Sequence, residues 1–570
     1  MNRRCILAFS GALVFTCVSL SAYLVAPYAA RRYIEKEFPG VTVKNVKLRT
    51  TGARLSLDVD RPGLRATLPD VWITRDKRVL VTGGHVWLTR GASSEASAGG
   101  VKQLTASDLT VEVTRKDWEG HLEGVALAAD GSVTIAKGTG KNQEVSGIVE
   151  GVCKTPDGVV TVDRAEVTMS SSSSRSSGRL DAVDLALWHA FRQPSRVGYT
   201  PMASRRPEDL DDPIQQPFRL EGITLTADHK RASVKTITAA AQRANGVKVD
   251  FGGPTLRVLV DSAVIQHPWL NPVATVFNRP VRITVADGML TAEIGNAGIS
   301  WNRAAKTVEG VGSCEAWVAA LPDGLREPLE GFTFTGKVDF KVNYGNKPSV
   351  TIKGGCYAKC DSKKIKALHK PFHYMVYSAK NELVDRVSGP NSKDWTPLGV
   401  MALTLPTAVI TMEDPGFVYH RGFVVAAYRN SLLDNLKLGR FHRGGSTISM
   451  QLAKNLWLRR DKTLGRKAQE FFLAQALESC FSKDQILELY LNVVEFGLDL
   501  YGVGPAAQRY FGVPAEMLSP VQAYWLASIL PRPRSAVPPN EAALERIGKL
   551  MSTLESSRSS GRLDAIGTTP

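Results

Sequence analysis

Apolar and polar residues alternate along the first half of the chain. Between about residues 38 and 355, runs such as VTVKNVKLR, ARLSLDVD, GVVTVDRAEVTM, RLEGITLTA and TFTGKVDFKVN repeat with a period of two. Successive side chains of a strand point to opposite faces, so this pattern predicts many strands with one apolar face. Asp130-Gly131, Asp287-Gly288 and Gly345-Asn346 are typical of hairpin turns between such strands. We therefore expect a large antiparallel all-β region, built as one long sheet, a sandwich or an open barrel.

The period becomes helical from about residue 396. The run GRKAQEFFLAQALESCF, residues 465–481, places its apolar residues largely on one helical face. Ser482 precedes the next helical run and has Gln485 three positions later, which is the spacing of a capping box. Ser519 followed by Pro520 starts another helix in the same way. The C-terminal part is therefore expected to be a compact, mainly α domain.

Two segments interrupt this organisation. A serine-rich stretch leads into a helix-like run, AVDLALWHAF, and then into Pro- and charge-rich sequence at 196–217 that predicts an exposed loop. The ten residues SSRSSGRLDA occur at 173–182 and again at 556–565. This repeat has no physical explanation in the sequence, and we attach no function to it.

The N-terminus carries a long uncharged run. Residues 5–30 lack charge and are flanked by Arg3-Arg4 and Arg31-Arg32. At about 1.5 Å per residue, a helix of this length crosses a hydrocarbon core of about 30 Å. The run therefore predicts a transmembrane anchor. A cleaved signal peptide is the alternative, because APYAA offers small residues near its end.

The composition and net charge of the chain favour some classes of binding partner over others. The chain has 570 residues, 43% hydrophobic and 22% charged, which is typical of a folded protein with two or three domains. A net charge of +16 favours an anionic partner. No recognised nucleic-acid motif is present, so a membrane surface or a phosphorylated substrate is favoured over nucleic acid.

The chain has seven cysteines, which could bind a metal, form disulfides or remain free thiols. Cys356 and Cys360, followed by His369 and His373, superficially resemble a zinc-finger set, but the gap is short and a proline separates the histidines. A local disulfide or free thiols are favoured. Cys480 is expected to pack within its helix. The pairing of Cys153, Cys314, Cys356 and Cys360 stays open.

Four polar clusters follow one another in the helical part. They are Glu413-Asp414 with Phe417, His420 and Gly422; Ser446-Thr447 with Gln451 and Lys454; Arg466-Lys467 with Glu470; and Tyr490 with Asn492. Each has a plain structural explanation: acids at a helix end, a helix start, a solvated ion pair and packing residues. Their order within one helical domain favours a functional site over coincidence.

These clusters resemble the motifs of glycosyltransferase family 51. This is the peptidoglycan glycosyltransferase family, found as monofunctional transglycosylases and fused to class A penicillin-binding proteins. Its motifs Glu-Asp-x-x-Phe-x-x-His-x-Gly, Gly-x-Ser-Thr-x-x-x-Gln and Arg-Lys-x-x-Glu are complete in the first three clusters, the second beginning at Gly444. Residues 486–492 match the fourth motif. The resemblance covers about a quarter of the chain, from about 396 to 535.

The resemblance implies a lysozyme-like helical fold that polymerises lipid II by inverting transfer from an undecaprenyl-pyrophosphate-linked donor. Glu413 would be the general base for the acceptor's 4-hydroxyl, and Asp414 would orient or tune it. Glu470 would face the donor, where it would stabilise developing positive charge or help hold a divalent metal. The expected substrate-binding residues are Ser446, Thr447, Gln451, Lys454, Lys462, Arg466, Lys467 and His420, with His420 mainly shaping the loop.

The resemblance also bears on cofactors and partners. It requires no cofactor and leaves open a divalent cation, Mg²⁺ or Mn²⁺, at the pyrophosphate. Lipid II, the growing glycan strand, the membrane and other cell-wall synthesis proteins are the expected partners. Two residues depart from the family pattern: Met450 replaces a usual glutamine, and Lys462 replaces a frequent arginine. Both departures are expected to weaken the grip on substrate.

Together these features predict a multidomain chain in the bacterial inner membrane, with a single span and a periplasmic catalytic domain. Its expected parts are a cytoplasmic tip and anchor (1–32), a β-rich extracytoplasmic region of unknown role (33–360), a linker (361–395), the glycosyltransferase domain (396–545) and a flexible tail (546–570). A lysozyme-like glycan hydrolase is one alternative. A membrane-anchored scaffold or lipid-binding β protein with a degenerate transferase domain is the other. No Ser-x-x-Lys with Lys-Thr-Gly partners is present, which excludes a penicillin-binding transpeptidase domain from this chain.

Overall fold

A computed structural model describes most of the chain. The described residues are 31, 35–36, 40–49, 52–74, 76, 78–89, 103–115, 118–142, 145–169, 218–239, 242–267, 271–345, 349–428, 430, 445–460 and 463–559. The chain divides into two compact units. Unit 1 comprises residues 1–179 and 204–263, and unit 2 comprises residues 180–203 and 264–570.

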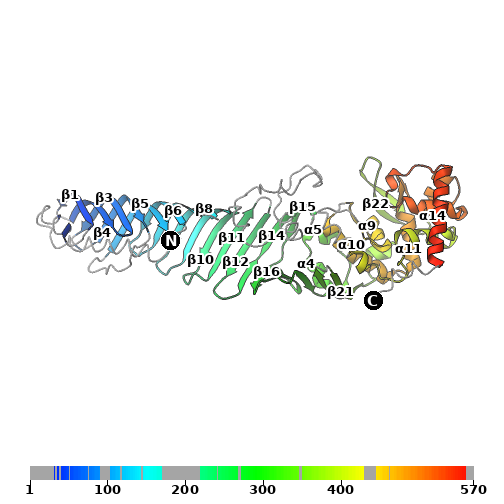
Figure 1. The fold of residues 1–570 in the computed structure, drawn as a ribbon, viewed down its shortest axis with the longest axis horizontal. Coiled ribbons are helices and arrows are strands. Elements are labelled where there is room, and N and C mark those ends of the chain that lie inside the picture. The colour runs from blue at the N-terminus through cyan, green and yellow to red at the C-terminus, as the bar shows by residue number, and fades with distance from the viewer. Residues whose placement is uncertain are drawn as a thin grey trace. The chain divides into compact units, whose positions relative to one another are not determined.

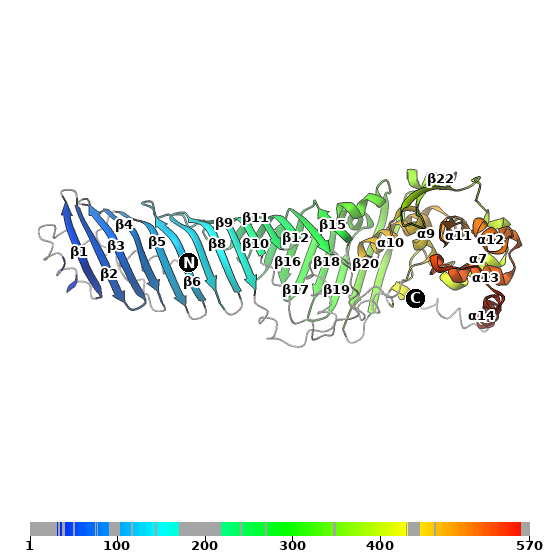
Figure 2. The ribbon, with the colours of Figure 1, turned by 90° about the horizontal axis from the view of Figure 1, so that it is seen from above.

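The described residues of unit 1 lie mainly in strands. They are β1 (Val41–Arg49), β2 (Gly52–Arg61), β3 (Leu64–Thr74), β4 (Arg78–Leu88), β5 (Gln103–Arg115), β6 (Trp118–Leu127), β7 (Val133–Lys141), β8 (Val145–Lys154), β9 (Val160–Met169), β10 (Phe218–Leu225), β11 (Arg231–Ala239), β12 (Gln242–Asp250) and β13 (Leu256–Val260). Strand β14 (Ser262–His267) lies at the sequence boundary of the units. Successive strands lie side by side, as Figure 2 shows in blue to cyan-green. The predicted turn at Asp130-Gly131 joins β6 to β7, with Gly131 at a φ of 87°.

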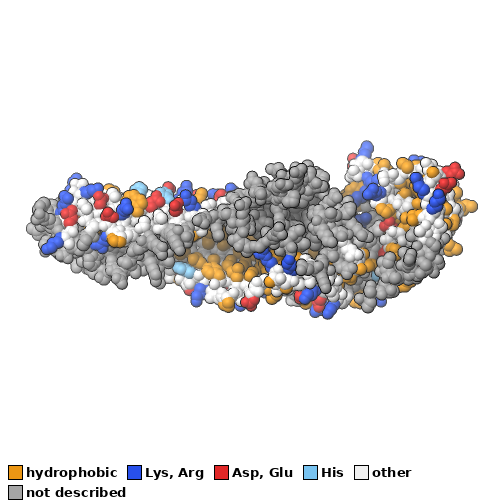
Figure 3. Space-filling view, in the orientation of Figure 1, with side chains coloured by type: hydrophobic (Ala, Val, Ile, Leu, Met, Phe, Trp, Pro, Cys, Tyr) orange, Lys and Arg blue, Asp and Glu red, His pale blue; other side chains and the backbone are white. Residues whose placement is uncertain are grey.

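The alternation predicted for these strands is observed. In β3 buried and exposed side chains alternate, and its Leu68 pairs across the sheet with Leu57 of β2. Both leucines belong to a core formed by one face of β1 to β7. The opposite face carries cross-strand ion pairs such as Lys44 with Asp58. Figure 3 shows basic and acidic side chains interspersed over this end of unit 1. One face is therefore apolar and the other polar, as period two requires.

The pairing of β4 with β5 corrects the prediction of a purely antiparallel region. These strands run parallel, in register from Arg78 opposite Gln103 to Leu88 opposite Val113. Parallel neighbours need a crossover of about a dozen residues or more. The stretch between Leu88 and Gln103 is long enough for such a crossover. The alternation of apolar and polar residues within each strand does not show whether two neighbouring strands run parallel or antiparallel.

Unit 2 begins with further strands and short helices. They are β15 (Asn271–Phe277), β16 (Val281–Ala286), β17 (Met289–Ile294), β18 (Ala297–Asn302), β19 (Thr307–Val311), α4 (Cys314–Ala320), α5 (Asp323–Arg326), η4 (Glu327–Leu329), β20 (Phe334–Asn343), β21 (Ser349–Ala358), α6 (Lys363–Ala367), β22 (Phe372–Tyr377) and β23 (Leu383–Ser388). The strands from β16 to β21 pair antiparallel in chain order. The predicted turn at Asp287-Gly288 joins β16 to β17, with both residues at positive φ. Gly345 lies just after β20, and Asn346 lies outside the described residues.

The C-terminal part of unit 2 is mainly helical, as predicted, and is drawn in yellow to red in Figure 1. Its elements are η5 (Leu398–Val400), α7 (Thr404–Glu413), α9 (Ile448–Trp457), α10 (Leu464–Cys480), α11 (Lys483–Val493), β24 (Glu495–Gly497), β25 (Leu500–Tyr501), α12 (Val503–Phe511), η6 (Ala515–Met517), α13 (Pro520–Ile529), η7 (Pro533–Ser535) and α14 (Glu541–Ser559). The capping boxes predicted at Ser482 with Gln485 and at Ser519 are both formed. Local sequence therefore sets where α11 and α13 begin.

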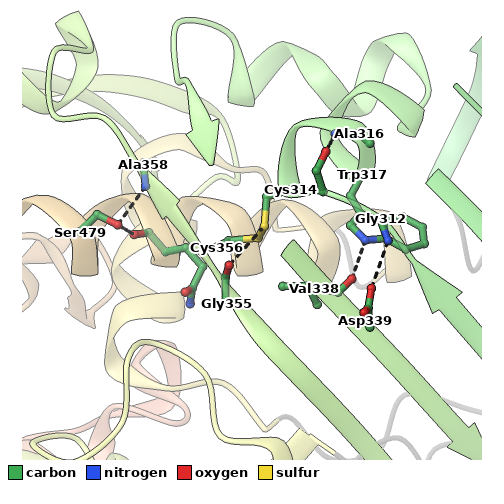
Figure 4. The surroundings of a disulfide bond; sticks show 12 residues. Gly312, Cys314, Ala316, Trp317, Val338, Asp339, Gly355, Cys356, Ala358 and Ser479 are labelled. Carbon is green, nitrogen blue, oxygen red and sulfur yellow. Dashed lines mark hydrogen bonds between the residues drawn. A yellow bond between two sulfur atoms is a disulfide. The ribbon is translucent and has the colours of Figure 1, made fainter. Parts of the chain in front are cut away.

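Within unit 2 the last strands share a hydrophobic core with the helices. Phe334 of β20 packs edge-on against Phe472 of α10, with ring centroids 5.4 Å apart. The backbone N–H of Ala358 donates to Ser479 Oγ at 3.0 Å, which fastens the end of β21 to α10 (Figure 4). Gln469 Nε2 donates to the Leu325 carbonyl at 2.9 Å. Helix α10 is therefore held along its length by residues that precede the helical region.

Two disulfides reinforce this junction and correct the cysteine predictions. Cys314 bonds to Cys356 (Figure 4), and Cys360 bonds to Cys480 at the end of α10. The local pairing expected for Cys356 and Cys360 is wrong, because each bonds to a cysteine far away in the sequence. Cys480 does more than pack. No group of three or more metal-ligating side chains occurs among the described residues.

The predicted transmembrane helix, and with it a single-pass location in the inner membrane, is wrong for the part of the chain that the structure describes. No helix there is both long and apolar enough to cross a membrane. Residues 1–30, on which that prediction rested, lie outside the described residues. The helix-like run 182–191 and the loop predicted at 196–217 lie outside them as well.

Candidate active site

Asp414 holds together the loop that follows α7. It is the C-cap of the helix and is 6% exposed. Its Oδ2 accepts from the backbone N–H of Ile448 at 3.0 Å, and its carboxylate lies 2.9 Å from His420 Nε2. The backbone N–H of Gly422 donates to His420 Nδ1 at 3.1 Å. Since Nδ1 is then the acceptor, Nε2 carries the proton and donates to Asp414. These hydrogen bonds link the loop to the start of α9.

Gly422 brings this loop against α9 and α10. Its φ is 75°, and a Cβ placed on it would lie 2.9 Å from Glu478 Cγ. The Gly422 carbonyl accepts a hydrogen bond from Thr447 Oγ1 at 2.8 Å. Thr447 Oγ1 also caps α9, because it accepts a hydrogen bond from the backbone N–H of Met450 at 3.2 Å. Only glycine combines this backbone conformation with such close packing. Thr447 is therefore placed at a helix start by the loop that carries Asp414.

Glu413, the last residue of α7, lies in a hydrogen-bonded row. Gln451 Nε2 donates to Glu413 Oε2 at 2.8 Å, and Gln451 Oε1 accepts from Tyr490 OH at 3.0 Å. Burial raises the pKa of Glu413 above its ordinary value, while the Gln451 hydrogen bond and the charge of Lys454 oppose this shift. A carboxylate with a raised pKa is a better proton acceptor near neutral pH. Glu413 therefore has the environment of a general base.

Glu470 is buried among cations on α10. It is 1% exposed, and its two carboxylate oxygens pair with Arg466 and with Lys467, whose Nζ lies 2.7 Å away. Lys467 also donates to Ser446 Oγ. Burial, and then the charges of Arg466 and Lys454, lower the pKa of Lys467 to about 7. The third motif therefore forms a compact charged cluster on the first turns of α10, fastened to the start of α9.

Lys454 connects the two acidic centres electrostatically. Burial lowers its pKa to about 8, and the positive charges of Arg466 and Arg460 lower it further, while Glu413 opposes the shift. Lys454 thus interacts with the candidate base on α7 and with the Arg466 that pairs with Glu470. The structure therefore brings the first three motifs into one charged cluster on α7, α9 and α10.

Of the two residues that depart from the family pattern, Met450 is among the described residues and Lys462 is not. Met450 is fully buried, so the side chain at that position packs in the core. Lys462 lies outside the described residues, as does Gly444.

Glu495 is an acidic residue near the site that belongs to none of the four polar clusters. Glu495 of β24 accepts from Arg460 Nη2 at 2.5 Å and from Arg534 Nε at 2.9 Å, and its charge acts on Lys454. No local sequence pattern points to Glu495. Tyr490 belongs to the fourth polar cluster, and its hydroxyl donates to Gln451 Oε1 at 3.0 Å. Asn492 is structural, because it bonds both the N–H and the carbonyl of Thr396.

Comparison with known proteins gives matches over the segment that contains these site residues. The family model described as Transglycosylase matches residues 380–555. A "Biosynthetic peptidoglycan transglycosylase" of Nitrosomonas eutropha is 46% identical over 140 residues, which are 25% of this chain and 57% of that protein. Proteins with the same name from Aromatoleum aromaticum and Alcanivorax borkumensis are 47% and 46% identical, covering 25% of this chain and 61% and 59% of theirs.

The chain thus spans about three fifths of the length of the curated relatives it matches. The matched residues contain all four polar clusters. Residues 380–555 are therefore a domain of the transglycosylase family.

Proposed function

We propose that this chain is a peptidoglycan glycosyltransferase that polymerises lipid II. The observation that carries the proposal is the shared cluster of Glu413, Lys454 and the Arg466–Lys467–Glu470 group, in a domain whose relatives are named for peptidoglycan transglycosylation. A glycosyl transfer from a diphosphate needs a base on the acceptor side and cations on the leaving-group side. The cluster supplies both.

Glu413 takes the proton from the acceptor sugar's 4-hydroxyl as that oxygen attacks the anomeric carbon of the donor. The donor's bond to its undecaprenyl pyrophosphate breaks, and inversion follows from direct displacement. Partial burial raises the pKa of Glu413 and suits it to this role. Such general-base catalysis contributes roughly 10²–10⁴-fold to the rate.

The cations of α9 and α10 stabilise the departing diphosphate. Lys454 and Arg466 are largely buried, so their charges act with little screening by water. Lys467 adds its charge below its pKa of about 7. Glu470 pairs with both Arg466 and Lys467 and so helps to hold them in place. A divalent cation, Mg²⁺ or Mn²⁺, at the pyrophosphate stays a prediction, and the steps proposed here use only the side chains of this chain.

The test is polymerisation of labelled lipid II by the purified full chain. Wild type should form glycan polymer, and E413Q should lose at least 100-fold in rate while keeping its fold. E516Q is the matched control, because Glu516 is an exposed acid at η6, outside the cluster, and its loss should leave the rate unchanged. Equal polymerisation by E413Q would refute the role of Glu413. Breakdown of finished glycan in place of polymerisation would identify a hydrolase instead.

A further inference from the structure

The row of hydrogen bonds behind Glu413 has a direction. An ionised carboxylate can only accept hydrogen bonds, so Gln451 must turn its NH₂ group toward Glu413. The Gln451 carbonyl then faces Tyr490, whose hydroxyl must donate to it. Each link fixes the next one, and the orientation of the amide depends on both ends.

We propose that Tyr490 is a positioning residue which, through Gln451, holds Glu413 in its ionised, proton-accepting form. The inference rests on the proposed function for its catalytic meaning, but the coupling itself is a property of the free protein. Tyr490 is completely buried in α11 and Gln451 lies on α9, so the row runs from α11 through α9 to the end of α7.

The donor at the far end of the row is permanent. Burial, together with the charges of Glu413 and Asp414, raises the pKa of Tyr490 well above its ordinary value. Its hydroxyl therefore keeps its proton throughout the working pH range. If that hydroxyl is removed, the Gln451 carbonyl loses its partner and the amide can rotate to face Glu413 with oxygen. An oxygen in that place favours the protonated carboxyl.

The experiment measures Glu413 directly, without substrate. The full chain is labelled with ¹³C-glutamate and titrated by infrared spectroscopy, and the spectrum of E413Q is subtracted to isolate the Glu413 carboxyl. Y490F should raise the pKa of Glu413 by roughly one unit, a tenfold change in its ionisation. Q451M removes the donor itself and should raise this pKa at least as far. The double variant Y490F/Q451M should match Q451M alone, because Tyr490 acts through the amide.

Tyr510 offers a matched control in the same domain. Its hydroxyl donates to the Phe496 carbonyl at 2.9 Å, away from Glu413, so Y510F should leave the Glu413 titration unchanged. An unchanged pKa in Y490F would overturn the proposal. An equal shift in Y510F, or a double variant beyond Q451M, would do the same. Should Y490F fail to fold, Q451N replaces it, since its shorter amide cannot bridge both groups and should also raise the pKa.

The pH dependence of the polymerisation rate provides a second test of the proposal. The acid limb of the pH–rate profile should move upward in Y490F, and raising the pH should restore the wild-type rate. A purely structural defect would lower the rate at every pH and leave the limb in place. If wild type forms no polymer at all, the proposed function fails, while the infrared titration still decides whether Tyr490 controls Glu413.

Discussion

The disulfide between Cys360 and Cys480 should be a major source of stability for the helical domain. It closes a loop with a sequence separation of 120 residues. The chain-entropy estimate for a loop of this size is about 5 kcal/mol, and disulfides commonly deliver about 2–4 kcal/mol of it. Cys360 is exposed and Cys480 is half-buried, so replacing both by alanine removes little packing. The double variant C360A/C480A therefore isolates the effect of the cross-link.

The assay combines calorimetry with hydrogen exchange on the full chain. A loss of 2–4 kcal/mol in a domain of this size lowers its unfolding midpoint by roughly 5–15 °C. Amides of α10 that exchange only when the domain opens should exchange about 30- to 1000-fold faster, since 1.4 kcal/mol is tenfold. Wild type in a reducing buffer that opens this bond should show at least the same changes.

Cys314 and Cys356 provide the comparison. Their separation is 42 residues, so the entropic contribution is smaller by about 1 kcal/mol. Both side chains are buried, however, and C314A/C356A loses packing as well. An unchanged midpoint together with unchanged exchange of α10 in C360A/C480A would refute the idea that this cross-link restrains the unfolded chain.

Three further predictions concern the charged cluster and its loop. Because the pKa of Lys454 is about 8, its charge is lost as the pH rises through that value, and polymerisation should fall with it; K454R keeps its charge and should move this limb upward by more than one unit. Gly422→Ala should destabilise the domain by about 1–3 kcal/mol, because its φ of 75° and the nearby Glu478 both oppose a Cβ; thermal unfolding measures this. E470Q should cost about 3–5 kcal/mol and most of the activity, because it removes the charge that compensates two buried cations.

Each of these predictions has its control. Gly399→Ala places a Cβ where no atom lies within 4 Å, so it should be neutral, and equal losses at both glycines would contradict the role of close packing at Gly422. A limb that stays at the same pH in K454R would show that another group titrates there. E516Q serves again beside E470Q, and a stable E470Q would mean that the two cations find compensation elsewhere.

What could be predicted from sequence was local or carried by motifs. The capping boxes at Ser482 and Ser519 involve neighbouring residues, and alternation along β3 reports directly on a two-faced sheet. The motif residues Glu413 and Glu470 could be singled out because the spacing of their motifs is distinctive, and their roles stay predictions. These features depend on a few consecutive positions, so one sequence is enough to recognise them.

What could not be predicted depends on contacts across long separations. Tyr490 and Gln451 lie 39 positions apart, and nothing in either segment signals their hydrogen bond. The partner of Cys480 lies 120 positions away, and a helical pattern gives no sign that one residue on it is cross-linked. Burial of Met450 likewise follows from how α9 packs, since helical periodicity alone does not say which face meets the core.

Strands β20 and β21 share a core with α10, and this limits how far the chain can be shortened from its N-terminal side. A fragment starting at residue 380, where the family match begins, would leave Cys480 without its bonded partner and Phe472 without Phe334. It would also strip Ser479 of the backbone N–H of Ala358. Cys356 of β21 is in turn bonded to Cys314, so a catalytic fragment that keeps these contacts must begin before Cys314. The boundary of the recognisable homology is therefore not the boundary of the folding unit.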